Sequence, residues 1–339
     1  MRMRAPHLLA VVVAGSMALG CAQRAPLSHT EEILWTTCTI TLYDHADTQT
    51  LDGAFQRLRE IHGRMSVGVP GSELDAIAAA AGKGPVHVTD DVFTVTQKAL
   101  QLARLSNGLF DPTVGPLIKV WKINKDNPEV PKPADIAAAR ALVNWRDVEL
   151  DDAAKTIFLK RPGMELDLGG LVKGYAADEA VRILSARGVR SAIIDLGGDI
   201  FAMGHGQSGQ PWRIGVQDPG AGRGNYLGIA RVIDKTVVTS GVYEHFFMKD
   251  GKRYHHLMDT RTGYPADNGL VSVTVITSSS MDADGFGLAL FCMGKTDGIR
   301  LGSKLGLGVV MVDSNHKVYV TPGTKDYFAI TDPLFSYAN

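Results

Sequence analysis

Two glycine-rich stretches place carboxylates and a lysine where a chain could bind phosphate. Asp167-Leu-Gly-Gly-Leu-Val-Lys173-Gly-Tyr-Ala-Ala-Asp178 runs into a predicted helix. Bare glycine backbone, the N–H groups at a helix N-terminus and an ammonium group together suit an anionic phosphate. Taken alone, the motif is also compatible with a plain strand–turn–helix whose lysine faces solvent. Asp195-Leu-Gly-Gly-Asp199 repeats the pattern 28 positions later, which predicts a second close approach of the backbone.

A dense polar cluster follows further along the chain. His256, Asp259 and Arg261 lie close together in sequence, and a Gly-Tyr-Pro turn at 263–265 ends the cluster. An imidazole titrates near neutrality and can act as a general base, although a lone histidine is more often structural. Because adjacent strand residues point to opposite faces, only one of His255 and His256 is expected to face a given site.

Two carboxylates stand at the start of another predicted helix. Asp282 and Asp284 follow the Ser278–Ser280 run. Such carboxylates are hard oxygen ligands for Mg²⁺. They are equally typical of helix-cap residues, because aspartate is favoured in a first turn.

The composition indicates an ordinary globular protein without a general affinity for nucleic acid. The 339 residues carry 35 Lys and Arg against 36 Asp and Glu, for a formal net charge of −1. A chain this close to neutrality has no global cationic field to hold nucleic acid. With 45% hydrophobic and 21% charged residues, it is not expected to be disordered.

Residues 1–21 are predicted to be a lipoprotein-type signal peptide. A basic start precedes an apolar run at 8–14, which is shorter than the roughly 20 residues that a membrane-spanning helix needs. Ala18-Leu-Gly-Cys21 resembles the bacterial lipobox, in which the cysteine is lipidated and becomes the mature N-terminus. Ordinary secretory cleavage near Ala22 is the alternative. We therefore expect the mature chain at the periplasmic face of the cell envelope, anchored to the membrane through Cys21.

Helix and strand patterns then alternate without a long linker, which predicts a single α+β domain over residues 22–339 with a central β-rich part. Asp250-Gly251 is the strongest short hairpin signal. Helices are expected over 51–65, 92–102, 135–143, 175–187, 283–293 and 297–305. Strands are expected over 37–43, 191–195, 212–217, 228–233, 245–248, 254–257, 271–277, 309–312 and 317–320.

Two further features are not expected to carry chemistry. The segment 204–209 satisfies GxGxxG, but Gln210-Pro211 follows it, where the helix of a dinucleotide-binding fingerprint cannot begin. We expect a flexible turn there. Cys38 and Cys292 form no CxxC motif, and isolated cysteines in an apolar context are more often buried than paired.

Together these motifs resemble the ApbE family of bacterial flavin transferases, which are often lipoproteins. The matching text is FDPTVGPL from residue 110, DLGGLVKGYAAD from 167, DLGGDI from 195, TSGVYE from 239, DGKRYHHLMDTRTGYP from 250 and SVTVITSSSMDAD from 272. The resemblance implies the family's α+β fold and an enzyme that uses FAD and Mg²⁺. Such an enzyme moves the FMN half of FAD onto a threonine of an acceptor redox protein, with release of AMP. FAD hydrolysis to FMN and AMP, or flavin binding with little catalysis, are the alternatives.

The resemblance also implies roles for individual residues. Asp284 matches the metal ligand and a catalytic position, and the backbone at Gly170 matches the other metal-facing element. His256 matches the base that activates the acceptor threonine, so transfer is expected to fall below its ordinary pKa of about 6.5. The implied flavin-nucleotide contacts are Leu109, Phe110, Asp111, Asp167, Lys173 and Met258.

Several positions depart from the family pattern, among them Leu34-Trp35-Thr36, Gly68 and Ala78, and one of them bears directly on the metal. Leu288 stands where the family usually has a threonine that binds the metal, and a leucine side chain cannot coordinate Mg²⁺. The resemblance further implies a subunit of a membrane redox pump, or another flavinylated protein, as the acceptor.

Overall fold

The computed structural model describes residues 25–44, 47–67, 69–123 and 127–338. The predicted signal peptide and Cys21 lie outside these ranges. Among the described residues, no helix is both long enough and apolar enough to cross a membrane.

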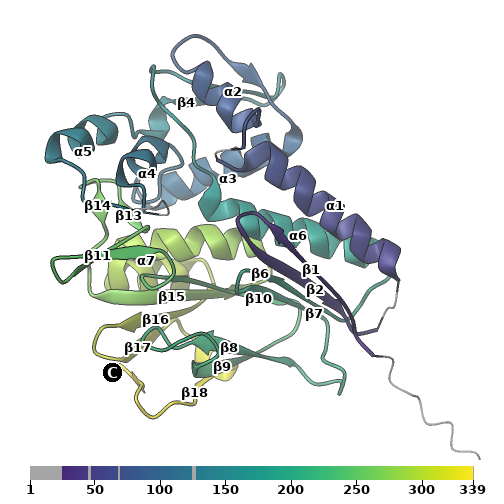
Figure 1. Cartoon of the computed structure of the whole chain (residues 1–339). Coiled ribbons are helices and arrows are strands. Elements are labelled where there is room, and N and C mark those ends of the chain that lie inside the picture. Colours follow the sequence, from purple (N-terminus) through teal and green to yellow (C-terminus); the bar gives the residue numbers. More distant parts are fainter. Residues whose placement is uncertain (1–24, 45–46, 68, 124–126, 339) are drawn as a thin grey trace, which may run out of the picture.

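A nine-stranded sheet lies at the centre of the described part of the chain (Figure 1). Its strand order is β1-β2-β6-β7-β10-β15-β16-β17-β19. Neighbouring strands are antiparallel except for the parallel pair β17 and β19. The strands are β1 (Leu27–Ile33), β2 (Thr36–Leu42), β6 (Ala192–Leu196), β7 (Asp199–Met203), β10 (Lys235–Gly241), β15 (Leu270–Thr277), β16 (Gly308–Asp313), β17 (Lys317–Val320) and β19 (Ser336–Tyr337).

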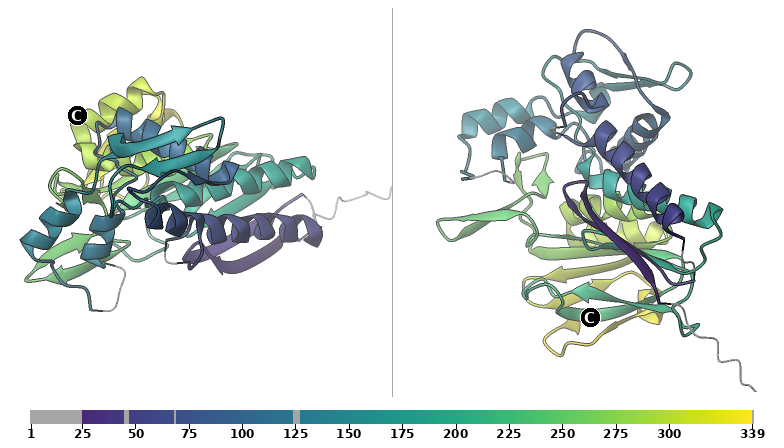
Figure 2. Two further views of the ribbon diagram at one scale, coloured as in Figure 1. Left: turned by 90° about the horizontal axis from the view of Figure 1, so that it is seen from above. Right: turned by 45° about the vertical axis from the view of Figure 1, so that its right-hand side comes forward.

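Helices cover one face of this sheet, and a smaller sheet covers the other (Figures 1 and 2). The helices are α1 (Thr48–Met65), α6 (Gly169–Ala186) and α7 (Ser280–Lys304), and the smaller sheet contains β8 (Trp212–Gln217), β9 (Tyr226–Val232) and β18 (Phe328–Ile330). Successive strand residues point to opposite faces. Val238 of β10 accordingly packs in the core under the helices, whereas its neighbour Val237 packs against the smaller sheet.

The remaining elements lie mostly above the helical face and around one end of the sheet (Figure 1). They are α2 (Glu73–Ala79), α3 (Asp90–Leu105), α4 (Gly115–Trp121), α5 (Pro133–Arg140), β3 (Val86–His87), β4 (Val148–Asp151), β5 (Thr156–Leu159), β11 (Phe246–Lys249), β12 (Lys252–His255), β13 (Met258–Asp259), β14 (Tyr264–Pro265) and the 3-10 turns Trp145–Asp147 and Thr324–Asp326.

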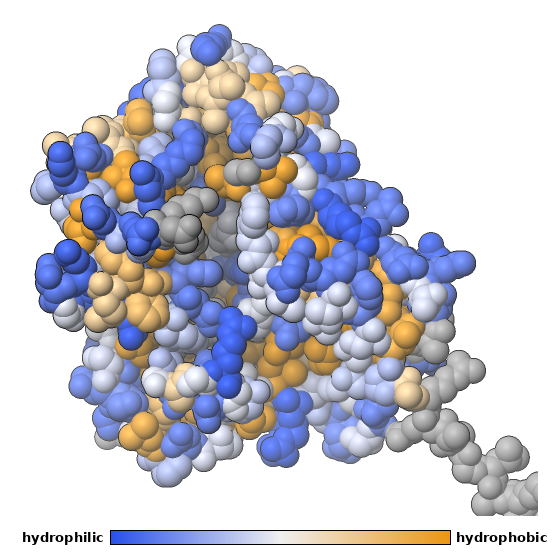
Figure 3. Space-filling view, in the orientation of Figure 1, coloured by the Kyte–Doolittle hydropathy of each residue, from blue (hydrophilic) through white to orange (hydrophobic). Residues whose placement is uncertain are grey.

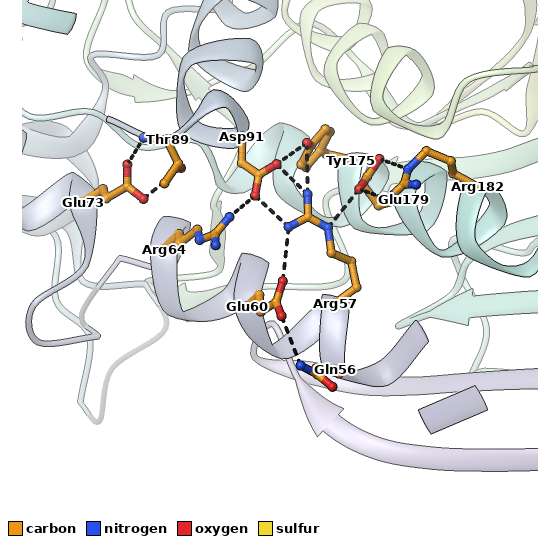
Figure 4. A network of polar contacts seen from close by, with 10 residues as sticks. All are labelled: Gln56, Arg57, Glu60, Arg64, Glu73, Thr89, Asp91, Tyr175, Glu179 and Arg182. Carbon is orange, nitrogen blue, oxygen red and sulfur yellow. Dashed lines mark hydrogen bonds and ion pairs between the residues drawn. The ribbon is translucent and has the colours of Figure 1, made fainter. Parts of the chain in front are cut away.

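A buried polar network ties α1, α3 and α6 together (Figure 4). Asp91, in the first turn of α3, accepts hydrogen bonds from Arg57 and Arg64 of α1 and from the Tyr175 hydroxyl of α6. Arg57 also donates to Glu179 of α6 at 2.8 Å. Burial opposes the charge of Asp91, but these hydrogen bonds lower its pKa to about 2. The network therefore fixes α6, the helix that carries Lys173, against α1 and α3.

The structure confirms the α+β class and most of the expected elements. The hairpin at Asp250-Gly251 is present, with positive φ at both turn residues (50° and 74°). The two helices expected over 283–293 and 297–305 are parts of α7, which is interrupted at Gly294 with φ of 77°. The segment 204–209 forms a turn. Cys38 and Cys292 are buried and free.

The expected start of one helix is wrong. The sequence predicts a helix from Tyr175, but α6 begins at Gly169. Glycine is a poor helix former, so the Gly169-Gly170 pair disguises the first turns. Tertiary contacts compensate: the Asp167 carboxylate accepts the Gly169 N–H at 2.8 Å, and the following turn packs closely against α7 at Gly174.

Candidate active site

A cavity of about 980 Å³ opens between the start of α6, the turn between β6 and β7, and the segments that follow β10 and β12. A hollow is visible beside α4 and α5 in Figure 3. The volume of the cavity lies at the upper end of the range typical of ligand pockets. All the site residues expected from the sequence line this one cavity: Leu109, Phe110, Asp111, Asp167, Gly170, Lys173, His256, Met258 and Asp284.

Lys173 contacts two carboxylates in the cavity. The Lys173 ammonium lies 2.5 Å from Asp199 Oδ2 and donates to Asp284 Oδ1 at 3.3 Å. Both carboxylates are buried, with 9% and 6% of their residues' surface exposed. Burial opposes the charge of Lys173, but the two carboxylates raise its pKa above the ordinary value. Burial also raises the pKa of Asp199, to about 6, against the effect of the ammonium. Lys173 therefore stays protonated at pH 7.

Close packing of α6 on α7 brings these groups together. A Cβ on Gly174 would lie 2.2 Å from the Ser280 carbonyl oxygen, so no larger residue fits at this crossing. The Gly174 N–H donates to Asp284 Oδ2 at 3.1 Å. Asp178, one turn further along α6, accepts the Ser280 N–H at the start of α7. The crossing thus sets the position of Asp284 relative to Lys173.

Gly170 lies against the same part of α7. In a regular helix the Gly174 N–H serves the Gly170 carbonyl, and here Asp284 also accepts from that N–H. The Gly170 oxygen thus shares its helical donor with Asp284. A methyl group of Leu288, one turn after Asp284, lies 3.1 Å from where a Cβ of Gly170 would be. Next to Gly170, α7 therefore presents the apolar side chain of Leu288.

The oxygen atoms around Asp284 suit a Mg²⁺ ion that also binds the phosphate of a substrate. Among the described residues, no group of three or more His, Cys, Asp or Glu side chains could hold a metal ion. Mg²⁺ is commonly bound by one or two carboxylates together with waters and substrate phosphates, rather than by an all-protein cage. A buried carboxylate at Asp284 that already faces a cation, on the segment of α7 that packs against Gly170, meets that requirement.

His256 reaches the cavity, whereas His255 does not. The His256 Nδ1 lies 3.3 Å from the His245 carbonyl oxygen, which can only accept. Nδ1 therefore carries the proton, and Nε2 keeps a free lone pair. Burial, followed by the neighbouring His245, lowers the pKa of His256 to about 3. This lowered pKa moves the expected acid limit below pH 6.5, because the half-buried imidazole stays neutral there.

His255 has a structural environment. Its Nε2 lies 3.0 Å from the Ala266 carbonyl oxygen, and its Nδ1 accepts the Leu257 N–H at 3.3 Å. Its ring packs edge-on against Phe291. Burial lowers its pKa to about 4. The expectation that only one histidine of the pair faces the site is confirmed.

Asp111 organises a loop in the cavity wall. Its Oδ1 accepts from the backbone N–H and the hydroxyl of Thr113, and its Oδ2 accepts from the Trp145 N–H. Burial raises the pKa of Asp111. With its oxygens engaged by the protein, Asp111 supports the adjoining Leu109 and Phe110 in the wall.

Asp167 lies at the other end of the α6 approach. One of its oxygens accepts the Gly169 N–H, and burial raises its pKa. Met258, in β13, is buried beneath the cavity among Leu117 and Trp121 of α4. Asp167 and Met258 therefore shape the cavity wall more than they add charge to it.

Several cavity residues are not assigned a role by the sequence. Asp199 is the main one, although the Asp195–Asp199 pattern had predicted a close backbone approach. That approach is confirmed: Gly197 and Gly198 both have positive φ, and a Cβ on Gly197 would lie 2.1 Å from the Thr36 hydroxyl oxygen. Gln217 and Tyr226, from β8 and β9, complete another wall, and no local sequence signal marks them.

Asp259 and Arg261 lie away from the chemistry. Arg261 donates two side-chain hydrogen bonds to the Asp259 carboxylate, at 3.0 and 2.8 Å. Burial opposes the charge of Asp259, but the hydrogen bonds from Arg261 lower its pKa. Neither residue lines the cavity, so His256 is the member of this polar cluster that lies there.

The chain belongs to the ApbE family, whose model matches residues 34–311. It is 35% identical to the FAD:protein FMN transferase of Klebsiella pneumoniae (strain 342), over 90% of this chain and 95% of the relative. It is 33% identical to the FAD:protein FMN transferase of Treponema pallidum, over 93% of this chain and 92% of the relative.

Solved structures of the family share the fold. The crystal structure of the ApbE protein from Thermotoga maritima superposes with a TM-score of 0.82 at 29% identity, covering 89% of this chain and 99% of that one. The flavin transferase ApbE from Vibrio cholerae gives a TM-score of 0.81 at 27% identity, with the same coverage.

Proposed function

We propose that this chain is an FAD:protein FMN transferase. The observation that carries the proposal is the meeting, in one cavity of about 980 Å³, of the α6 N-terminus, the Lys173–Asp284 pair and the neutral imidazole of His256. These are the groups that a pyrophosphate and a nucleophilic hydroxyl require. The relatives named above carry the same activity in their names.

The reaction exchanges the phosphoanhydride bond of FAD for a phosphate ester bond to the acceptor. The threonine hydroxyl of the acceptor attacks the phosphorus atom of the FMN half of FAD, and His256 Nε2 takes the hydroxyl proton. A bond forms between the threonine oxygen and that phosphorus. The bond from the phosphorus to the bridging oxygen breaks, and AMP leaves with the bridging oxygen. Lys173 and the N–H groups at the start of α6 balance the negative charge of the phosphates.

We further propose that Mg²⁺ binds at Asp284 and the Gly170 carbonyl. A bound Mg²⁺ supplies charge neutralisation at the phosphate oxygens. Leu288 offers no ligand, so phosphate oxygens of FAD and water would complete the coordination. The proposal is supported by the buried carboxylate of Asp284 and by the packing of this part of α7 against Gly170.

The acceptor and the location of the chain are also proposals. We propose an acceptor subunit of a membrane redox pump or another flavinylated protein, at the periplasmic face of the membrane. The basic start, the short apolar run and the lipobox-like 18–21 support anchoring through Cys21. Replacing Cys21 by serine should then move the protein from the membrane fraction to the soluble fraction, and unchanged membrane association would contradict the anchor.

The activity is tested by incubating the mature chain with FAD, Mg²⁺ and a redox-pump subunit. Flavin fluorescence of the acceptor is read in a denaturing gel, and AMP is measured by chromatography. A fluorescent acceptor together with AMP supports transfer. Free FMN with AMP and an unlabelled acceptor would instead indicate hydrolysis. FAD that stays bound and intact would indicate a flavin-binding protein.

A further inference from the structure

Lys173 is shared between a proposed metal ligand and a second carboxylate. Its ammonium lies closer to Asp199 (2.5 Å) than to Asp284 (3.3 Å). Asp199 is the first residue of β7 in the sheet, whereas Lys173 and Asp284 come from the crossing of α6 and α7. The two carboxylates therefore hold the ammonium from two independent parts of the fold.

This arrangement bears on how a divalent cation reaches Asp284. An ammonium ion paired with a carboxylate neutralises it and occupies one of its oxygens, so it competes with any other cation for that group. The competition is strengthened by burial of the carboxylates, because Asp284 and Asp199 are both buried although 28% of the Lys173 side chain stays exposed. An ammonium with a second carboxylate within reach can leave the first without becoming unpaired.

We propose that Asp199 is a positioning residue that holds the Lys173 ammonium while a divalent cation binds Asp284. The inference rests on the proposed Mg²⁺ site and adds a role for a residue that need not touch the metal. Without Asp199, Lys173 pairs with Asp284 alone and weakens metal binding. With Asp199 present, both the ammonium and the metal can face the phosphates of FAD together.

Calorimetric titration of Mg²⁺ into the mature chain, without FAD, tests the inference independently of catalysis. Asp199→Asn should weaken Mg²⁺ binding about tenfold, the scale of one hydrogen bond to a charged group. The double variant Asp199→Asn with Lys173→Met should bind Mg²⁺ at least as tightly as the unmodified chain, because the competitor is gone. Circular dichroism and thermal unfolding establish that each variant is folded.

Asp195→Asn is the matched control. Asp195 lies in the neighbouring strand β6 and lines the same cavity, and its Oδ1 accepts the Gly198 N–H at 2.7 Å, which an asparagine oxygen can also do. The substitution removes the same charge without removing a contact to Lys173. It should therefore change Mg²⁺ binding by much less than Asp199→Asn.

Each contrary outcome overturns the inference in a distinct way. Unchanged Mg²⁺ binding in Asp199→Asn would show that the lysine does not compete. Weak binding that the double variant fails to restore would show that Asp199 is itself a ligand. If the unmodified chain binds no Mg²⁺, Asp284 is not a metal site and Lys173 does not have to make room for a metal. FMN transfer is assayed separately, so its loss alongside the expected binding pattern would contradict the proposed function and leave the role of Asp199 standing.

Discussion

His256 combines a half-buried ring, a fixed tautomer and an open lone pair. A general base that acts on a hydroxyl typically contributes about 10²–10⁴-fold to a rate. His256→Ala should therefore lower FMN transfer by a factor in that range, while FAD binding, measured by fluorescence quenching, changes little.

His255→Ala should show the opposite pattern. It removes two buried hydrogen bonds and should cost about 1–3 kcal/mol of stability, with the folded fraction still active. Equal loss of transfer in both variants would contradict the assignment of the base.

The same histidines determine the pH dependence. Their pKa values lie near 3 and 4 in the folded chain, against about 6.5 when unfolded. Between these values the unfolded chain binds more protons, so stability falls as the pH is lowered from about 6.5 towards 3. His256 stays neutral in this window. We expect the transfer rate of the folded protein to show no inflection near pH 6.5, while the unfolding midpoint drops with acidification. A rate inflection near 6.5 would mean that the imidazole titrates as it does in water.

Leu288 gives the proposed metal site its most specific test. Leu288→Thr places a hydroxyl one turn after Asp284, beside Gly170. It should tighten Mg²⁺ binding by about 1–2 kcal/mol, comparable to a hydrogen bond to a charged group. Comparing the Mg²⁺ midpoint of activity and of calorimetric binding for both forms measures the gain. An unchanged midpoint would mean that water or a phosphate oxygen already fills this position.

At the scale of elements, the crossing of α6 and α7 determines the site. Gly174→Ala places a methyl group 2.2 Å from a backbone carbonyl, so the helices must separate. We expect a loss of about 1–3 kcal/mol, the usual range for overpacking, together with loss of transfer as Asp284 moves from Lys173. Gly53→Ala in α1 is the control, because its Cβ meets nothing within 4 Å. Through its higher helix propensity, the alanine should raise the free energy of unfolding by up to about 1 kcal/mol and the thermal midpoint slightly. A Gly174→Ala protein with unchanged activity would contradict the role of the crossing.

Local patterns predicted most elements but missed those whose formation depends on partners. The hairpin at Asp250-Gly251 and the helix over 51–65 follow from turn chemistry and periodicity. The first turns of α6 do not, because glycine propensity argues against a helix that the contact with α7 stabilises. In the site, the motifs identified Lys173 and Asp284 separately. Asp199 acquires its significance only from a salt bridge to a residue 26 positions earlier in another layer.

At the scale of the whole molecule, the sheet order assembles the cavity. β2 pairs with β6, and β10 lies between β7 and β15, so segments near residues 110, 170, 197, 256 and 284 meet at one end of the sheet. Pairing between strands so distant in sequence leaves no local signal, which is why the motifs alone gave their order but not their adjacency. Only the resemblance to the ApbE family placed them together, and the shared fold with the Thermotoga maritima and Vibrio cholerae proteins agrees with that placement.

The most direct test of the central claim is the mass of the acceptor after reaction. The mature chain is incubated with FAD, Mg²⁺ and the acceptor subunit, and the intact acceptor mass and the AMP released are measured on the same sample. The account predicts that the acceptor gains one FMN group through a threonine, with one AMP released per acceptor modified, and that His256→Ala abolishes both in parallel. An acceptor of unchanged mass, with or without AMP in solution, would contradict it.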